Sequence, residues 1–162
     1  MQNIIHEAHK LLLKRGKTLA IAESCTGGLL LSLLTRNPGS SRYLKLGIVA
    51  YSNEAKEAVL RVPKAAILKH GAVSRKTAVL MAGNIRKMIK ADFGIAITGI
   101  AGPKGASRYK PVGTVFIAIS NTKKTTCVKF LFKGGRIAIQ RKSALKALKL
   151  LKKVIQCVPS SL

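Results

Sequence analysis

The stretch TLAIAESCTGGLLLSLL, residues 18–34, places a short polar segment between two apolar runs. Thr18 to Ala22 is typical of a short buried strand, and Thr26 to Arg36 is typical of a helix. The segment between them, ESCTGG (residues 23–28), carries two hydroxyls, a thiol, a carboxylate and two glycines. A plain turn needs fewer chemical groups than this. The segment is therefore a candidate site as well as a turn.

Outside this stretch, helical and strand patterns alternate along the chain. Helices separate the first three strands, and the last two strands form a hairpin. This order predicts an α/β fold, a three-layer α/β/α sandwich around a mixed, mainly parallel five-stranded sheet. The strand that follows the glycine-rich loop 98–111 is expected to be the antiparallel one. The expected strands are 18–22, 44–51, 93–97, 112–120 and 125–132, and the expected helices are 1–15, 26–36, 53–60, 63–70, 74–90 and 136–157.

Length and hydropathy predict one folded domain over residues 1–162. Hydrophobic residues make up 48% of the chain, which excludes disorder as its general state. No apolar run reaches the roughly 18 residues of a membrane span, and residues 1–16 lack the pattern of a signal peptide. We therefore expect a soluble, cytoplasmic protein with no membrane partner. The three cysteines are far apart, which argues against a disulfide framework or a metal site.

The chain carries 30 basic and five acidic residues, for a net charge of +25. Such a field attracts polyanions and small anionic ligands alike. Aromatic residues are only 4% of the chain, tryptophan is absent, and no nucleic-acid-binding motif is visible. The lysines are also spread along the whole sequence. We therefore expect any association with nucleic acid to be non-specific at most.

Three polar loops follow the three predicted parallel strands, at Glu23–Gly28, Tyr51–Lys56 and Thr98–Gly113. In open α/β sheets, ligands bind beyond the carboxyl ends of the parallel strands. Because these loops would meet at that edge, they are the leading candidates for a binding or catalytic site.

The first loop offers a nucleophile and possible anion donors. Thr26, Gly27 and Gly28 would lie at a helix N-terminus, where backbone N–H groups favour an anion. Ser24 would project from the strand-to-helix turn. The alternative is that Ser24 or Thr26 merely caps the helix. Cys25 is a second candidate nucleophile, but alternation along the turn places it opposite Ser24, and Ser24 is favoured.

A serine nucleophile needs a base, and the sequence offers no persuasive Ser-His-Asp set. Asp92 precedes a strand at the wrong end of the sheet, and His6 and His9 are expected on the surface of the first helix. Lys56 is the candidate base, acting directly or through the Tyr51 hydroxyl. In a chain with so many lysines, an ordinary surface position is the competing interpretation of Lys56.

The other two loops add candidate substrate-binding groups. Asn53 is a candidate contact in the second loop and could also cap a short helix. In the third loop, small residues after a buried strand could line a pocket with N–H donors, or form an ordinary flexible connection. The candidates in this loop are Thr98, Gly99, Gly102 and Gly113.

Six motifs occur in order: AESCTGG (22–28), GSS (39–41), YSNEAK (51–56), HGAVS (70–74), AITGIAGP (96–103) and KPVGTV (110–115). Together they resemble the CinA C-terminal domain family, the nicotinamide mononucleotide deamidases. The resemblance covers about residues 3–155 and suggests a stand-alone domain.

The resemblance implies hydrolysis of the carboxamide of nicotinamide mononucleotide to nicotinate mononucleotide and ammonia, in pyridine-nucleotide recycling. It also implies a homodimer that needs no metal and no cofactor. Ser24 matches the family's proposed nucleophile, and Tyr51 and Lys56 match the groups proposed to activate it. Ser41 and Thr98 match positions at the substrate site.

One departure from the family bears on substrate binding. The family usually has an Arg four residues after the Arg that matches Arg136, and this chain has Gln140 there. Arg141 is the neighbouring substrate-binding candidate, although one residue turns about 100° around a helix. The family often has acidic residues directly after the HGAVS motif, where this chain has Arg75 and Lys76. An alternative function is therefore a nucleotide-binding or interaction module that has lost turnover.

Overall fold

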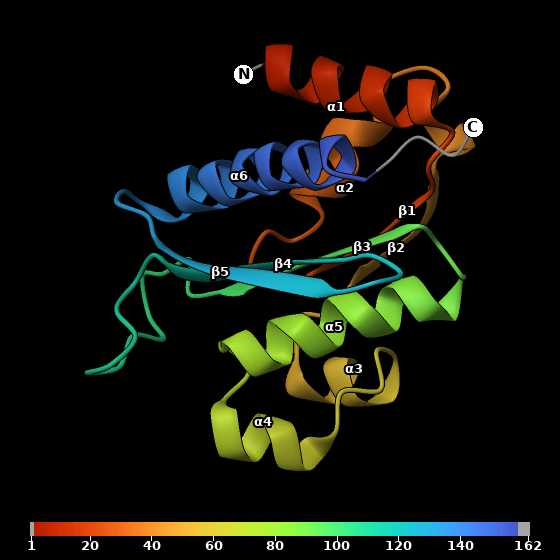
Figure 1. Cartoon of the computed structure of the whole chain (residues 1–162). Helices are drawn as coiled ribbons and strands as arrows, with labels where there is room; N and C mark the ends of the chain where they lie inside the picture. Colours follow the sequence, from red (N-terminus) through yellow and green to blue (C-terminus); the bar gives the residue numbers. More distant parts are fainter. Residues whose placement is uncertain (1, 159–162) are drawn as a thin grey trace.

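A computed structural model describes residues 2–158, and Figure 1 shows its three layers. A five-stranded sheet with the order β2-β1-β3-β4-β5 lies between two layers of helices. The strands are β1 (Leu19–Glu23), β2 (Leu44–Val49), β3 (Phe93–Gly99), β4 (Thr114–Ser120) and β5 (Thr125–Leu131). The helices are α1 (Gln2–Arg15), α2 (Leu29–Thr35), α3 (Asn53–Ala58), α4 (Lys64–His70), α5 (Arg75–Met88) and α6 (Arg136–Gln156), with a short 3-10 turn η1 (Ser40–Arg42).

The sheet is mixed, and the predicted α/β fold is confirmed. Strand β1 pairs in parallel with β2 and β3, whereas β4 is antiparallel to both of its neighbours, β3 and β5. The antiparallel strand is the one expected from the glycine-rich loop. That loop returns the chain to the edge where β3 ended, and Gly113 N–H donates to the carbonyl of Ile100 over 2.8 Å.

The two faces of the sheet carry side chains of different size. Ile21, Ile95 and Ile97 pack on the side of α1, α2 and α6. The opposite face presents Ala22 and Ala96 towards α5. Small residues allow the α5 backbone to approach the sheet closely. The two helical layers of Figure 1 therefore lie on sheet faces of different character.

Two element boundaries differ from the sequence prediction for a physical reason. The second helix begins at Leu29 instead of Thr26, because residues 24–28 form turns in which Gly27 and Gly28 have φ values of +62° and +92°. Thr98 belongs to β3, because the strand continues to pair with β4 as far as Gly99. The remaining predicted boundaries agree to within about two residues. The predicted start of the first helix at Met1 lies outside the described residues.

His9 is not on the surface, so that expectation was wrong. Its side chain is buried, and Nδ1 lies 3.2 Å from the Tyr43 hydroxyl. Burial lowers the pKa of His9 and raises that of Tyr43 to about 12. His6, one turn earlier, is exposed as expected. The pair joins α1 to the chain just before β2. Among residues 2–158, no helix is both long enough and apolar enough to cross a membrane.

Candidate active site

The loops after β1, β2 and β3 meet at one edge of the sheet. Ser24 N–H donates to the carbonyl of Ile97 over 3.0 Å, which ties the turn after β1 to β3. Ala50 N–H donates to the carbonyl of Glu23 over 2.8 Å, which ties the same turn to the chain after β2. These bonds follow from the parallel pairing. Ser24, Tyr51 and Thr98 are therefore neighbours in space.

The turn after β1 keeps the Ser24 side chain nearly buried and leaves its hydroxyl without a hydrogen bond to the described residues. The residue is 7% exposed, and its Oγ has no hydrogen-bond partner in the part of the chain that the structure describes. Thr26 Oγ1 is buried and also lacks a partner among residues 2–158. A buried hydroxyl normally finds a partner. Neither side chain caps α2, so the capping interpretation of Ser24 and Thr26 was wrong.

Glu23, and not the Ser24 or Thr26 hydroxyl, caps the start of α2. Its carboxylate, fully buried, accepts the backbone N–H groups of Gly28, Leu30 and Leu31 at 2.8–3.2 Å. The negative charge also faces the positive end of the helix. The only sequence signal for this role is an acidic residue at the end of an apolar strand, directly before a glycine-rich turn.

The expectation that the N–H groups of Gly27 and Gly28 bind an anion was wrong, because both groups already donate within the turn. Gly28 N–H is donated to Glu23, and Gly27 N–H is donated to the carbonyl of Ser24 over 3.0 Å. These two groups are therefore not available to a substrate. Thr26 N–H has no acceptor among residues 2–158, so Thr26 supplies the open donors of this turn.

Lys56 is a buried lysine, not one of the many surface lysines. It is 2% exposed, and Nζ donates to the carbonyls of Ala50 and Ser52 at 3.0 and 3.1 Å. No carboxylate pairs with it in residues 2–158. Burial lowers the pKa of Lys56, and the charges of Cys25 and Glu54 offset this only in part. An ammonium has three donors, and the described chain occupies two of them.

Tyr51 and the start of α6 form a second part of the site. Tyr51 is 58% exposed, and its hydroxyl accepts a hydrogen bond from Arg136 Nη2 over 2.5 Å. Arg136 Nη1 donates to the carbonyl of Gly102 over 2.8 Å. One guanidinium thus links the loops after β2 and β3. Arg136 was not among the predicted site residues, because nothing local in the sequence places a residue so distant beside Tyr51.

Gln140 lies one helical turn after Arg136 and faces the same way. Its Nε2 donates to the carbonyl of Cys25 over 2.9 Å. The neighbouring Arg141 is exposed and forms no polar contact with the described residues. The structure therefore brings Gln140 to the turn of the candidate nucleophile and leaves Arg141 outside it.

Cys25 is poorly suited to act as a nucleophile. Its side chain packs in the apolar core on the α6 side of the sheet. Burial raises the pKa of the thiol to about 12, with the nearby carboxylate of Glu23 adding to this effect. The reactive thiolate is therefore scarce at neutral pH.

Most of the remaining candidates of the third loop, namely Thr98, Gly99 and Gly113, have structural roles in the fold. Thr98 is buried, and its Oγ1 donates to the carbonyl of Ala72 over 2.8 Å. A side chain on Gly113 would lie 1.9 Å from the carbonyl oxygen of Phe132, and one on Gly99 would collide with β4. Both glycines therefore allow close packing. Only Gly102, through its carbonyl, contacts another site residue.

Two further candidates stand apart from this cluster. Asn53 is exposed in the first turn of α3, and it is Ser52 that caps this helix by accepting Ala55 N–H over 3.0 Å. Ser41 lies at the opposite edge of the sheet. It precedes Tyr43, whose carbonyl accepts Leu19 N–H where β1 begins. Within one chain, Ser41 is therefore remote from Ser24.

The fold and this edge define an α/β protein in which a desolvated lysine lies close to the turn that holds a near-buried serine. A family model, the CinA C-terminal domain, matches residues 1–155, and the chain belongs to this family. No group of three or more His, Cys, Asp or Glu side chains that could hold a metal ion occurs among residues 2–158.

Similar proteins support the same assignment. A CinA-like protein of Anaeromyxobacter sp. (strain Fw109-5) is 48% identical over 141 residues, 87% of this chain and 34% of the relative. The crystal structure of competence damage-inducible protein A from Klebsiella pneumoniae has a TM-score of 0.94 and 32% identity, and covers 98% of both chains. A competence/damage inducible protein from Agrobacterium tumefaciens has a TM-score of 0.91 and 34% identity, covering 96% of this chain and 94% of its own. The chain spans about a third of the length of the curated relatives it matches.

Proposed function

We propose that this chain is an amidohydrolase that converts nicotinamide mononucleotide and water to nicotinate mononucleotide and ammonia, and so acts in pyridine-nucleotide recycling. The observation that carries the proposal is Lys56. It is a buried amine with a lowered pKa and no carboxylate partner in residues 2–158, and it lies beside the turn that holds Ser24. A desolvated lysine is one of the groups that can activate a serine. Family membership and the bonds that join the three loops support the same function.

In this mechanism, Ser24 Oγ attacks the carboxamide carbon and its proton passes to neutral Lys56, directly or through the Tyr51 hydroxyl. The tetrahedral intermediate then collapses, the C–N bond breaks, and Lys56 returns the proton to the leaving ammonia. An ester to Ser24 remains. Water, deprotonated by the same lysine, hydrolyses this ester and restores the enzyme.

Thr26 is our candidate for stabilising the oxyanion. Its N–H has no acceptor and its buried Oγ1 has no partner among the described residues. At such sites, preorganised hydrogen-bond donors stabilise the negative charge that develops on the oxygen in the transition state. Arg136, fixed by Tyr51 and Gly102, is the candidate cation for the substrate phosphate.

We further propose that the active form is a homodimer. The family resemblance assigns Ser41 to the substrate site, but one chain places Ser41 and Ser24 at opposite edges of the sheet. A second copy of the chain would bring its Ser41 to the site of the first. Sedimentation of the purified chain tests this assembly.

The direct test is ammonia release from nicotinamide mononucleotide by the purified chain. We expect Ser24→Ala and Lys56→Ala to abolish turnover, because each removes a group that makes or breaks a bond. Ser32→Ala and Lys64→Ala are matched controls, since neither side chain forms a hydrogen bond or a salt bridge in residues 2–158. Full activity in Ser24→Ala would refute the nucleophile assignment.

A second candidate function is nucleotide binding without turnover. Gln140 favours it, because this neutral side chain bonds to the nucleophile turn where the family carries an arginine. Calorimetric binding of nicotinamide mononucleotide with no ammonia release would establish this alternative. Any binding to DNA is expected to be non-specific and to weaken steeply with salt.

A further inference from the structure

A cavity lies at the end of the molecule opposite the candidate active site. Its volume is about 430 Å³, within the range of small-molecule sites. It lies between the starts of β1 and β3, the β4–β5 turn and the C-terminal end of α6. Strand β1 connects Lys17 at the cavity to Ser24 at the candidate active site, so the two lie roughly 20 Å apart. The two sites cannot share one small ligand.

The rim of this cavity is strongly cationic. It carries four lysines, Lys17, Lys123, Lys124 and Lys153, against one carboxylate, Asp92. Asp92 is occupied, because it pairs with Lys17 at 3.2 Å and accepts the N–H and hydroxyl of Thr18 at 2.8 Å. The other three lysines form no ion pair within residues 2–158. The rim therefore has cationic groups to spare for an anion.

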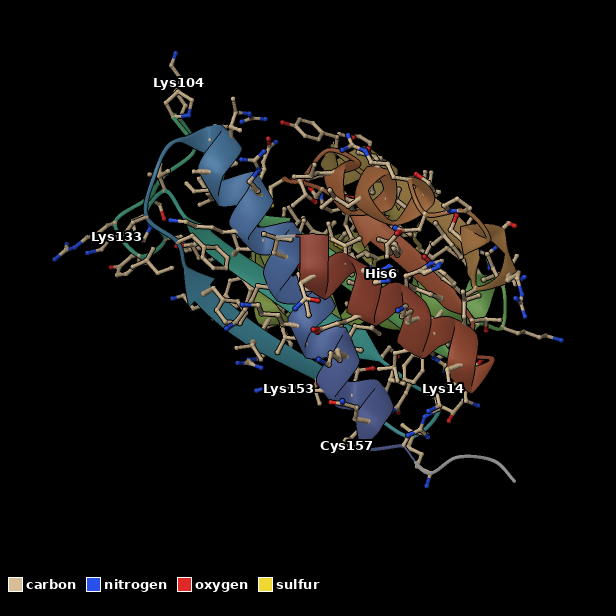
Figure 2. The ribbon with its side chains drawn as sticks, turned by 90° about the horizontal axis from the view of Figure 1, so that it is seen from above. His6, Lys14, Lys104, Lys133, Lys153 and Cys157 are labelled. Carbon is tan, nitrogen blue, oxygen red and sulfur yellow. The ribbon has the colours of Figure 1, made fainter. Side chains whose placement is uncertain are left out.

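The interior of the cavity is mainly apolar. Phe93, Val154 and Val158 contribute to its lining, and the aliphatic stems of the lysines can cover further apolar surface. Cys157 also lines it and is exposed, whereas Cys25 and Cys127 are buried. Figure 2 shows Lys153 and Cys157 near the same end of α6, away from Lys104. An apolar interior with a cationic rim is complementary to a ligand that has an apolar body and an anionic end.

We propose that this cavity binds a small organic anion with an apolar body, such as a medium-chain carboxylate. The apolar body would be removed from water against Phe93 and Val154, and the carboxylate would lie between Lys124 and Lys153. Charge-assisted hydrogen bonds to a carboxylate are among the stronger ones. The site is separate from the candidate active site and does not depend on the proposed deamidase function.

Cys157 provides the test, because alkylation of the one exposed thiol among the described cysteines reports on occupancy. The rate of Cys157 alkylation by iodoacetamide is measured by mass spectrometry with increasing decanoate, below its micelle concentration. Bound decanoate should slow alkylation several-fold in a saturable manner. Decanol, which lacks the charge, should protect only weakly.

The variant Lys124→Gln/Lys153→Gln should need about tenfold more decanoate for half-protection. The matched variant Lys64→Gln/Lys69→Gln removes the same charge from exposed positions on α4 and should behave like the parent. Circular dichroism confirms that each variant is folded. The proposal is overturned if decanoate gives no saturable protection, if decanol protects equally, or if both double variants lose protection alike.

Discussion

Lys56 shows how one residue can be read in two ways from sequence and in one way from structure. Its position after Tyr51 suggested a base, and the abundance of lysine suggested a surface group. The structure buries it against the carbonyls of Ala50 and Ser52. Burial without a carboxylate disfavours the charged form. The chemistry of the proposed site follows from this single placement.

The lowered pKa of Lys56 predicts how stability depends on pH. Above the folded-state pKa, the folded chain binds fewer protons here than the unfolded chain, whose lysine titrates near 10.5. The free energy of unfolding of the parent, relative to Lys56→Met, should therefore rise as pH increases through the folded pKa towards 10.5. Urea denaturation of both proteins at several pH values measures this difference. A difference that falls or stays flat would contradict the burial argument.

Gln140 gives a prediction about substrate affinity. Gln140→Arg should lower the KM for nicotinamide mononucleotide about ten- to a hundred-fold, since a charge-assisted bond to phosphate contributes about 1.5–3 kcal/mol. Gln156→Arg adds the same charge at the far end of the same helix and is the matched control. Steady-state ammonia release measures both. Equal changes in the two variants would show a general charge effect instead of a local contact.

At the scale of single residues, sequence patterns predicted most members of the candidate site but not the contacts between them. The polar residues after three strands drew attention to Ser24, Lys56 and Thr98, because strand ends can be read from local patterns. The helix cap by Glu23 and the bond from Arg136 to Tyr51 could not be predicted this way. Both depend on the relative placement of segments, which a local pattern does not carry.

At the scale of elements, the close approach of α5 to β3 depends on Gly94. A Cβ at this position would lie 2.2 Å from the backbone oxygen of Ala82 and 2.7 Å from the Cβ of Arg86. Neither atom can move without shifting the α5 backbone. The alanines on this face of the sheet serve the same close packing.

Gly94→Ala should therefore destabilise the fold by about 1–3 kcal/mol, the usual cost of overpacking. Gly83 offers a matched control on α5, because a Cβ there meets nothing within 4 Å. Gly83→Ala should stabilise the protein by up to about 1 kcal/mol through helix propensity. Urea denaturation measures both effects. Equal destabilisation by the two substitutions would contradict the packing argument.

The elements themselves were largely predictable because hydrophobic periodicity and turn residues mark them. The mixed sheet and its antiparallel strand β4 are confirmed. The late start of α2 was missed, since the Thr26-Gly27-Gly28 segment reads as a helix start unless the Glu23 cap is known. A side-chain cap from the preceding strand replaces the local cap that the pattern suggested.

At the scale of the whole molecule, like-charge repulsion opposes folding. The net charge is +25, and the described residues form two salt bridges, Lys17–Asp92 and Lys152–Glu7. Raising NaCl from about 0.01 M to about 0.15 M shortens the screening length from about 30 to about 8 Å. The melting temperature should therefore increase. Calorimetry measures it, KCl should give the same shift, and a decrease would contradict net repulsion.

Helix α6 has a consequence for how the chain is synthesised. It follows all five strands, yet it covers the face of the sheet that carries Ile21 and Ile95, and Gln140 contacts Cys25 across 115 positions. On the ribosome, the part of this apolar face that α6 covers stays open until α6 has emerged. The chain must then form its most distant contacts last, so exposure of the growing sheet to chaperones and to aggregation ends only with this helix.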